Sequence, residues 1–217
     1  MKVVMPKNKS VDLIVLIDRS GSMSNISKDM SGGLNKFIEE QKKLDGVCRV
    51  TLADFDSQEL RFLNIADDIQ KVEPYNLIPR AGTPLFDAIT NTFAKYEEYA
   101  KDKMDSRICM IITDGEENCS SEVKDPNIIR TFLKNKQEKE GWEIIYLGAD
   151  HDAFSAAHSM GVASAANYNK TSMSVDNMYG TLHNKMSGVR KGTVRSASLS
   201  QDDVDAIVSQ DSVKWEK

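Results

Sequence analysis

The chain has 217 residues, 40% of them hydrophobic and 28% charged, which is enough for one domain with a full core and too little for two. Its formal net charge of −5 argues against nucleic-acid binding, because the overall field repels phosphate. The longest apolar runs are strand-sized, shorter than the ~20 residues that span a bilayer, and the N-terminus lacks the apolar segment of a signal peptide. We therefore expect a soluble, cytoplasmic protein with no membrane contact.

Three cysteines, Cys48, Cys109 and Cys119, are widely spaced along the chain. An odd number at this spacing fits neither a disulfide framework nor a zinc site. Cys48 and Cys109 lie in or beside apolar runs, so we expect them to be small buried side chains. The three histidines are not spaced as a zinc pair either.

Apolar runs alternate with helix-like segments, which indicates an α/β fold with a mainly parallel sheet. Residues 11–17 (VDLIVLI) are almost continuously apolar, as in a central strand covered on both faces. Residues 29–44 repeat apolar side chains at helical spacing. Residues 49–55 and 59–64 are predicted as two further strands, and the intervening Asp-Ser-Gln favours a hairpin between them. The expected sheet is therefore doubly wound and mainly parallel, with one antiparallel edge strand and helices on both faces.

The rest of the chain continues this alternation until residue 190. The later elements are predicted, in chain order, as a helix at 84–99, strand 107–113, helix 127–139, strand 143–147, helix 153–160, edge strand 165–168 and helix 174–190. The composition then becomes polar, which predicts a tail with a weak helix at 202–209. We divide the chain into an extension (1–9), an α/β domain (10–190) and a polar C-terminal tail (191–217).

The first candidate site directly follows the strand at 11–17, as Asp18-Arg19-Ser20-Gly21-Ser22. Ligands of open parallel sheets collect at the carboxyl ends of the strands. The alternating spacing lets Asp18, Ser20 and Ser22 point the same way, and their carboxylate and hydroxyl oxygens suit Mg²⁺ or Mn²⁺. Taken alone, the loop also fits an ordinary turn in which Ser22 or Ser24 caps the next helix.

Two more segments place oxygen-bearing side chains at corresponding positions. Asp114-Gly115 follows the strand at 107–113, and Gly82-Thr83-Pro84 opens the helix at 84–99. Read singly, Asp114-Gly115 is a turn and Thr83 is a helix cap. Their joint occurrence with the first motif favours a shared metal site.

Together these motifs resemble a von Willebrand factor A (vWA) domain with a metal-ion-dependent adhesion site. Asp18, Ser20 and Ser22 match its first motif (DRSGS), Thr83 its second (GTP) and Asp114 its third (TDG), and the similarity extends over residues 10–190. Stretches such as TPLFDAI, ITDGEEN and YLGADHDAFSAAHSMGV resemble intracellular members from bacteria and phages.

The resemblance implies one divalent cation, Mg²⁺ or alternatively Mn²⁺ or Ca²⁺. It implies that Ser20 and Ser22 bind this cation directly, that Asp18 and Asp114 act partly through water, and that Thr83 joins when a ligand is bound. A protein partner's Asp or Glu carboxylate then completes the coordination. Because hydroxyls leave the cation's charge only partly offset, an incoming carboxylate is strongly attracted.

Four other residues near these motifs are candidates for a partner-binding rim: Arg19, Glu116, Glu117 and Asp152. For Glu116 and Glu117 a solvated loop is the competing interpretation, and for Asp152 a cap on the following helix. Asp87, one turn into the helix at 84–99, either stabilises that helix's N-terminus or orients a metal-bound water.

Two further functions stay open beside a non-enzymatic binding module. A Mg²⁺-dependent hydrolase is one, although phosphoryl-transfer enzymes of this type place a second acid where Ser20 stands, and neither G-x-S-x-G nor a Walker loop is present. A structural assembly protein with a silent metal site is the other. The resemblance also implies that the helix at 174–190 moves when the metal site fills.

Overall fold

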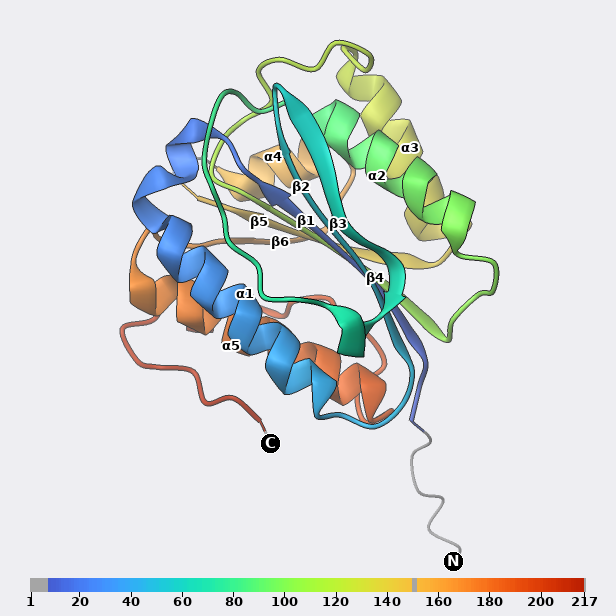
Figure 1. Ribbon diagram of the computed structural model, residues 1–217. Coiled ribbons are helices and arrows are strands. Elements are labelled where there is room, and N and C mark those ends of the chain that lie inside the picture. The colour runs from blue at the N-terminus through green and yellow to red at the C-terminus, as the bar shows by residue number, and fades with distance from the viewer. Residues whose placement is uncertain (1–7, 150–151, 217) are drawn as a thin grey trace, which may run out of the picture.

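The computed structural model describes residues 8–149 and 152–216, which form a six-stranded sheet between two layers of helices (Figure 1). The sheet order is β3-β2-β1-β4-β5-β6. The strands are β1 (Val11–Asp18), β2 (Cys48–Asp56), β3 (Glu59–Asp68), β4 (Ser106–Thr113), β5 (Trp142–Gly148) and β6 (Ser164–Asn167). The helices are α1 (Ser27–Lys42), α2 (Leu85–Tyr99), α3 (Pro126–Glu138), α4 (Ala153–Ser159), α5 (Ser172–Arg190) and α6 (Gln201–Val208), with the short 3₁₀ helices η1 (Gly21–Ile26) and η2 (Ile69–Lys71).

Strand β1 is the centre of the sheet and is buried along its whole length. It pairs in parallel with β2 on one side and β4 on the other. Its odd-numbered apolar residues enter the core under α1 and α5, and Ile14 and Leu16 enter the core under α2, α3 and α4. The continuous apolar run therefore reflects burial on both faces, as predicted.

The one antiparallel strand is β3, which lies at the edge of the sheet and returns from β2 through a tight turn. Asp56 fixes this turn, since its Oδ1 accepts hydrogen bonds from the backbone N–H groups of Gln58 and Glu59 at 2.6 and 3.1 Å. The predicted hairpin and the predicted fold class are both confirmed.

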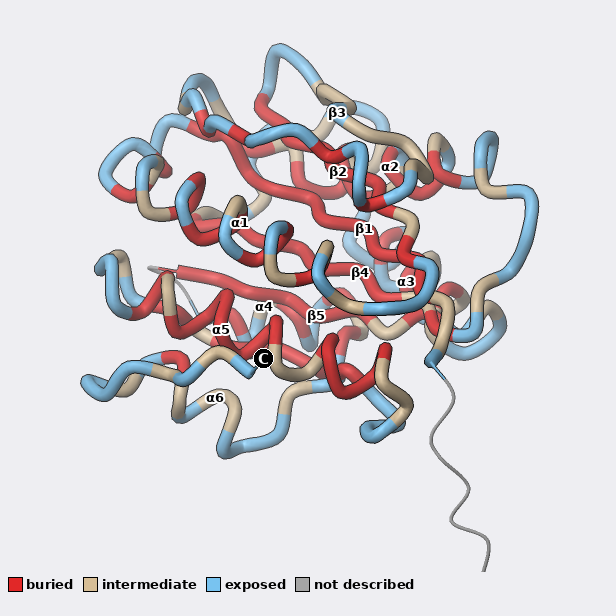
Figure 2. The backbone as a smooth tube through the Cα atoms, turned by 60° about the horizontal axis from the view of Figure 1, so that its bottom comes forward, coloured by how far each residue is buried: buried red, intermediate tan, exposed pale blue. Residues whose placement is uncertain are grey.

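Helices α1 and α5 cover one face of the sheet, and α2, α3 and α4 cover the other (Figure 1). The tube view shows β1, β2, β4 and β5 as a mainly buried layer, whereas the edge strand β3 is partly exposed (Figure 2). Helices α1 and α5 approach closely at Gly33, where an added Cβ would lie 2.3 Å from the Tyr179 ring. Cys48 and Cys109 are buried, as expected.

The polar segment after α5 packs back onto the domain rather than extending from it. Helix α6 forms within one residue of its predicted position, and its Ile207 is fully buried. Beyond it, the backbone of residues 209–216 is hydrogen-bonded by Asn177 and Asn184 of α5. Trp215 packs against Gly180 and His183. Among the described residues, no helix is both long enough and apolar enough to cross a membrane.

Candidate metal centre

The three predicted motifs meet at the carboxyl edge of the sheet. Asp18 is the last residue of β1, and Asp114 follows the last residue of β4, the strand paired with β1. Because paired parallel strands end at the same edge, the two carboxylates become neighbours. Thr83 reaches this edge from the loop that precedes α2.

Ser20 and Ser22 connect the first motif to the third motif through hydrogen bonds. Ser20 Oγ lies 2.9 Å from Ser22 Oγ, and Ser22 Oγ donates to Asp114 Oδ1 at 2.7 Å. Neither serine caps a helix, since η1 and α1 both begin without a side-chain cap. Ser24 also does not cap α1, because its hydroxyl donates to the Gly21 carbonyl. Neither Ser22 nor Ser24 therefore has the capping role of the ordinary-turn interpretation.

Asp18 is buried and tightly held. Its Oδ1 accepts from the Ser20 backbone N–H and its Oδ2 from Thr113 Oγ1, both at 2.6 Å. Burial raises the pKa of Asp18 from 3.8 to about 6, and the nearby Asp114 charge acts in the same direction. Two carboxylates brought together out of water favour a cation that balances their charge.

The position of Gly115 shows how closely the oxygens converge. An added Cβ there would lie 3.4 Å from Thr83 Oγ1 and 3.9 Å from both Asp18 Oδ2 and Ser22 Oγ. Thus three side-chain oxygens, two from the first motif and one from the second, lie within 4 Å of one point beside the third motif. This set of hard oxygen donors fits Mg²⁺, Mn²⁺ or Ca²⁺.

Thr83 is held through hydrogen bonds of its backbone, and its side chain does not cap a helix. Helix α2 begins after Pro84 without any side-chain cap, so the helix-cap interpretation of Thr83 is wrong. The Thr83 N–H donates to Asn118 Oδ1 at 3.0 Å, and the Asn118 N–H donates to the Thr83 carbonyl at 3.2 Å. Asn118 thereby couples the second motif to the loop of the third, a contact that its sequence position did not predict.

Asp87 has a structural role, which the sequence left undecided. Its carboxylate accepts hydrogen bonds from the backbone N–H groups of Ser121, Glu122 and Val123. Burial acts to raise the pKa of Asp87, but these backbone donors outweigh it and hold the pKa below the ordinary value. Asp87 therefore orders the loop after Asp114.

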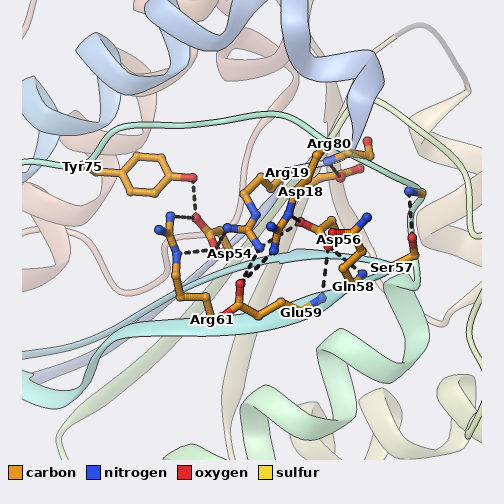
Figure 3. Close-up of polar contacts among 12 residues, drawn as sticks. Asp18, Arg19, Asp54, Asp56, Ser57, Gln58, Glu59, Arg61, Tyr75 and Arg80 are labelled. Atoms are coloured by element: carbon orange, nitrogen blue, oxygen red, sulfur yellow. Dashed lines mark hydrogen bonds and ion pairs between the residues drawn. The ribbon is translucent and has the colours of Figure 1, made fainter.

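Arg19 does not lie on a partner-binding rim, which corrects the prediction. It is only 4% exposed, and its guanidinium contacts Asp54, Asp56 and Glu59 (Figure 3). Between Asp18 and Ser20 in an extended segment, a side chain must point to the opposite side, toward the neighbouring strand β2.

The same ion network stabilises the loop that carries Thr83. Arg80 pairs with Asp56 and Glu59, and Arg61 and Tyr75 bind Asp54 (Figure 3). The Arg80 N–H also donates to the Arg19 carbonyl at 2.8 Å. Three arginines and three carboxylates thus tie the first motif, the β2–β3 turn and the second motif together.

The structure places the other three rim candidates around one cavity. Glu117 accepts from the Phe86 N–H at the start of α2, and Asp152 caps α4 by accepting from the Ser155 N–H at 3.0 Å. Glu116 is exposed. All three line a cavity of about 340 Å³ between α2 and α4. Asp152 therefore has the capping role that was the competing interpretation.

Lys170 was missed by sequence reasoning. Its Nζ lies 2.6 Å from Asp114 Oδ2, although it belongs to the loop between β6 and α5. No motif marks this position, and only the sheet order brings the loop after β6 to the same edge as Asp114. The described residues contain no cluster of three or more His, Cys, Asp or Glu side chains suited to a metal.

Comparison with known proteins identifies the fold. The sequence matches no family model and no curated protein. In three dimensions the chain is similar to a von Willebrand factor type A protein from Catenulispora acidiphila, at 14% identity and a TM-score of 0.58, over 83% of this chain and 43% of that one. It is also similar to proximal thread matrix protein 1 from the mussel byssus, at 14% identity and a TM-score of 0.58, over 85% and 47% of the two chains.

A further structure of the mussel protein, described with a zinc-occupied MIDAS motif, matches at 16% identity and a TM-score of 0.56, over 87% of this chain and 46% of that one. The chain thus spans a little under half the length of each of these structures. The chain therefore has the vWA fold, and its mixed six-stranded sheet is the one expected of that fold.

Proposed function

We propose that this chain is a divalent-cation-dependent protein-binding module. The cation is held by Ser20, Ser22 and Thr83, with Asp18 and Asp114 acting directly or through water, and it takes a carboxylate from a protein partner. The observation that carries the proposal is the convergence of Thr83, Asp18 and Ser22 oxygens around Gly115. The zinc-occupied motif in a protein of the same fold supports a divalent cation at this edge of the sheet.

The chemistry of the donor set supports binding of a carboxylate. Three of the five side chains are neutral hydroxyls, so a bound cation keeps attraction for a further anionic ligand. Mg²⁺ prefers such oxygen donors and usually retains several exchangeable waters, one of which a partner carboxylate replaces. Ser22 is exposed, so this side of the site is accessible to a partner.

We propose that the site binds without turnover and that the protein works in the cytoplasm of a bacterial or phage-infected cell. The histidines that the structure describes lie away from the site: His158 is on the exposed surface of α4, and His183 contacts Gln41 and Trp215. The three cysteines of the chain are free thiols, which is compatible with a reducing compartment.

The first test is metal titration. Calorimetry with Mg²⁺ and Mn²⁺ should show one site in the wild-type chain and at least tenfold weaker binding after Ser22→Ala, since a direct ligand is lost. Ser24→Ala is the matched control, because Ser24 lies in the same 3₁₀ turn but its hydroxyl bonds the Gly21 carbonyl. Equal affinity in the wild type and both variants would contradict the proposed site.

The second test concerns the partner. Proteins captured from the native host in Mg²⁺ should be released by a chelator and be absent when Asp18→Ala is used as bait. Capture that is indifferent to the chelator would contradict metal-dependent binding. Hydrolysis of phosphate or ester substrates that disappears with Asp18→Ala would replace the binding module with an enzyme.

A further inference from the structure

Lys170 places a positively charged ammonium group beside the proposed metal centre. Its Nζ pairs with Asp114 Oδ2 at 2.6 Å, and it lies 3.5 Å from the Ser22 carbonyl oxygen. The other oxygen of the same carboxylate, Oδ1, accepts from Ser22 Oγ. The lysine side chain is 19% exposed and the Asp114 side chain is fully buried, so water weakens this pair little.

The backbone around Lys170 is fixed on both sides. Tyr168 precedes it, and its hydroxyl donates to the Thr113 carbonyl at 3.0 Å, directly before Asp114. Thr171 follows it and caps α5 by accepting from the Ser174 N–H. The Asn169 N–H donates to Ser174 Oγ at 2.9 Å. Lys170 is therefore presented to the site by an ordered loop and does not reach it as a flexible surface side chain.

The ammonium group of Lys170 changes the charge of the site that a partner carboxylate approaches. Asp18 and Asp114 bring two negative charges, which a divalent cation alone would cancel. Lys170 adds one positive charge beside Asp114 to the charge that the cation brings. The ammonium group repels a divalent cation and therefore lowers the affinity of the site for the metal. It attracts a carboxylate and therefore raises the affinity of the loaded site for the partner.

We propose that Lys170 is a specificity-determining residue of the metal centre, which weakens cation binding and strengthens capture of the partner carboxylate. This inference rests on the proposed function. It predicts opposite effects on two affinities, a pattern that a purely structural role does not produce.

The test uses the full chain, with Mn²⁺ as the metal probe and acetate as the carboxylate probe. Electron paramagnetic resonance of free Mn²⁺ measures metal affinity, and water-proton relaxation by bound Mn²⁺ measures acetate binding. Lys170→Gln should bind Mn²⁺ on the order of tenfold more tightly and acetate several-fold more weakly. Lys170→Arg keeps the charge and should stay close to the wild type in both measurements.

Lys95→Gln is the matched control, since Lys95 is a surface lysine paired with Glu98 on α2. Thermal unfolding of each variant shows whether the fold survives. If Lys170→Gln lowers both affinities, or leaves metal affinity unchanged, the inference is overturned. A wild-type chain that binds no Mn²⁺ would instead overturn the proposed function on which the inference rests.

Discussion

Thr113 donates its hydroxyl to Asp18 Oδ2 at 2.6 Å, so the last residue of β4 holds the last residue of β1. This hydrogen bond connects β4, which leads into the third motif, to Asp18, which is the first residue of the first motif. Thr113 Oγ1 also accepts from the Gly115 N–H at 3.1 Å, which fixes the glycine around which the other oxygens converge. A motif residue that is not one of the five proposed metal ligands therefore sets the orientation of the buried carboxylate.

Replacing Thr113 by Val should weaken the metal site through Asp18. The isosteric change keeps the packing but removes one of the hydrogen bonds that stabilise the charged carboxylate, so we expect about tenfold weaker Mg²⁺ binding and a loss of stability of about 1–2 kcal/mol. Calorimetry and urea unfolding measure the two effects. Thr92→Val is the matched control, since the buried Thr92 hydroxyl has no hydrogen-bond partner and its loss should be neutral or stabilising.

Metal-free protein should lose stability as the pH rises through the titration of Asp18. Burial raises the pKa of Asp18 to about 6, so between pH 3.8 and about 6 the folded state keeps a proton that the unfolded chain releases. The stabilisation is complete below pH 3.8 and lost above about 6, an effect on the order of 3 kcal/mol. Mg²⁺ affinity should rise over the same range, because the charged carboxylate is the form that holds metal.

Urea unfolding at a series of pH values, with and without Mg²⁺, measures this linkage. Asp18→Asn removes the titrating group, so its metal-free form should show less loss of stability between pH 4 and pH 7 than the wild type. A variant with the same pH profile as the wild type would assign the dependence to another group.

The positions of the strands along the chain were predictable because each carries a continuous or alternating apolar run. The five motif residues were predictable because each lies at a strand or helix boundary at this edge. The position of Arg19 was predictable in principle, since the alternation that directs Asp18 and Ser20 toward the candidate metal site directs Arg19 away from it. Its interpretation as a rim residue followed its place in the motif and ignored that alternation.

The structural features that the sequence did not predict depend on contacts between segments that are distant in sequence. Lys170 meets Asp114 only because β6 lies in the same sheet as β4. The segment at 209–216 packs through its backbone and through amide side chains, which leave no periodic apolar pattern to read.

The packed C-terminal segment should contribute measurably to stability. Asn177 is fully buried, donates to the carbonyls of Ser209 and Asp211, and accepts from the Val213 N–H at 2.8 Å. Asn177→Ala leaves these groups without their partner, so we expect a loss of about 2 kcal/mol and faster proteolysis within residues 209–216. Ser212→Ala, at an exposed position of the same segment, should change neither measurement. An unchanged unfolding midpoint in Asn177→Ala would show that the segment adds nothing to the fold.

Adding a single methyl group at Gly115 should block the metal site and spare the fold. The new Cβ would lie at ordinary contact distances, 3.4 Å from Thr83 Oγ1 and 3.9 Å from Asp18 Oδ2 and Ser22 Oγ, so no backbone shift is required. It would nevertheless stand among the three oxygens proposed to hold the cation, and a cation with bonds of ~2.1 Å to oxygen tolerates no carbon there. We expect Gly115→Ala to lower Mg²⁺ affinity at least tenfold and to change stability by less than about 1 kcal/mol.

The matched control is Gly32→Ala on the exposed surface of α1, where an added Cβ meets nothing within 4 Å. That change should stabilise the helix by about 0.5–1 kcal/mol and leave metal affinity unaltered. If Gly115→Ala binds Mg²⁺ as tightly as the wild type does, the cation cannot lie where Thr83, Asp18 and Ser22 converge. The five residues would then be neighbours in the fold without forming one coordination site.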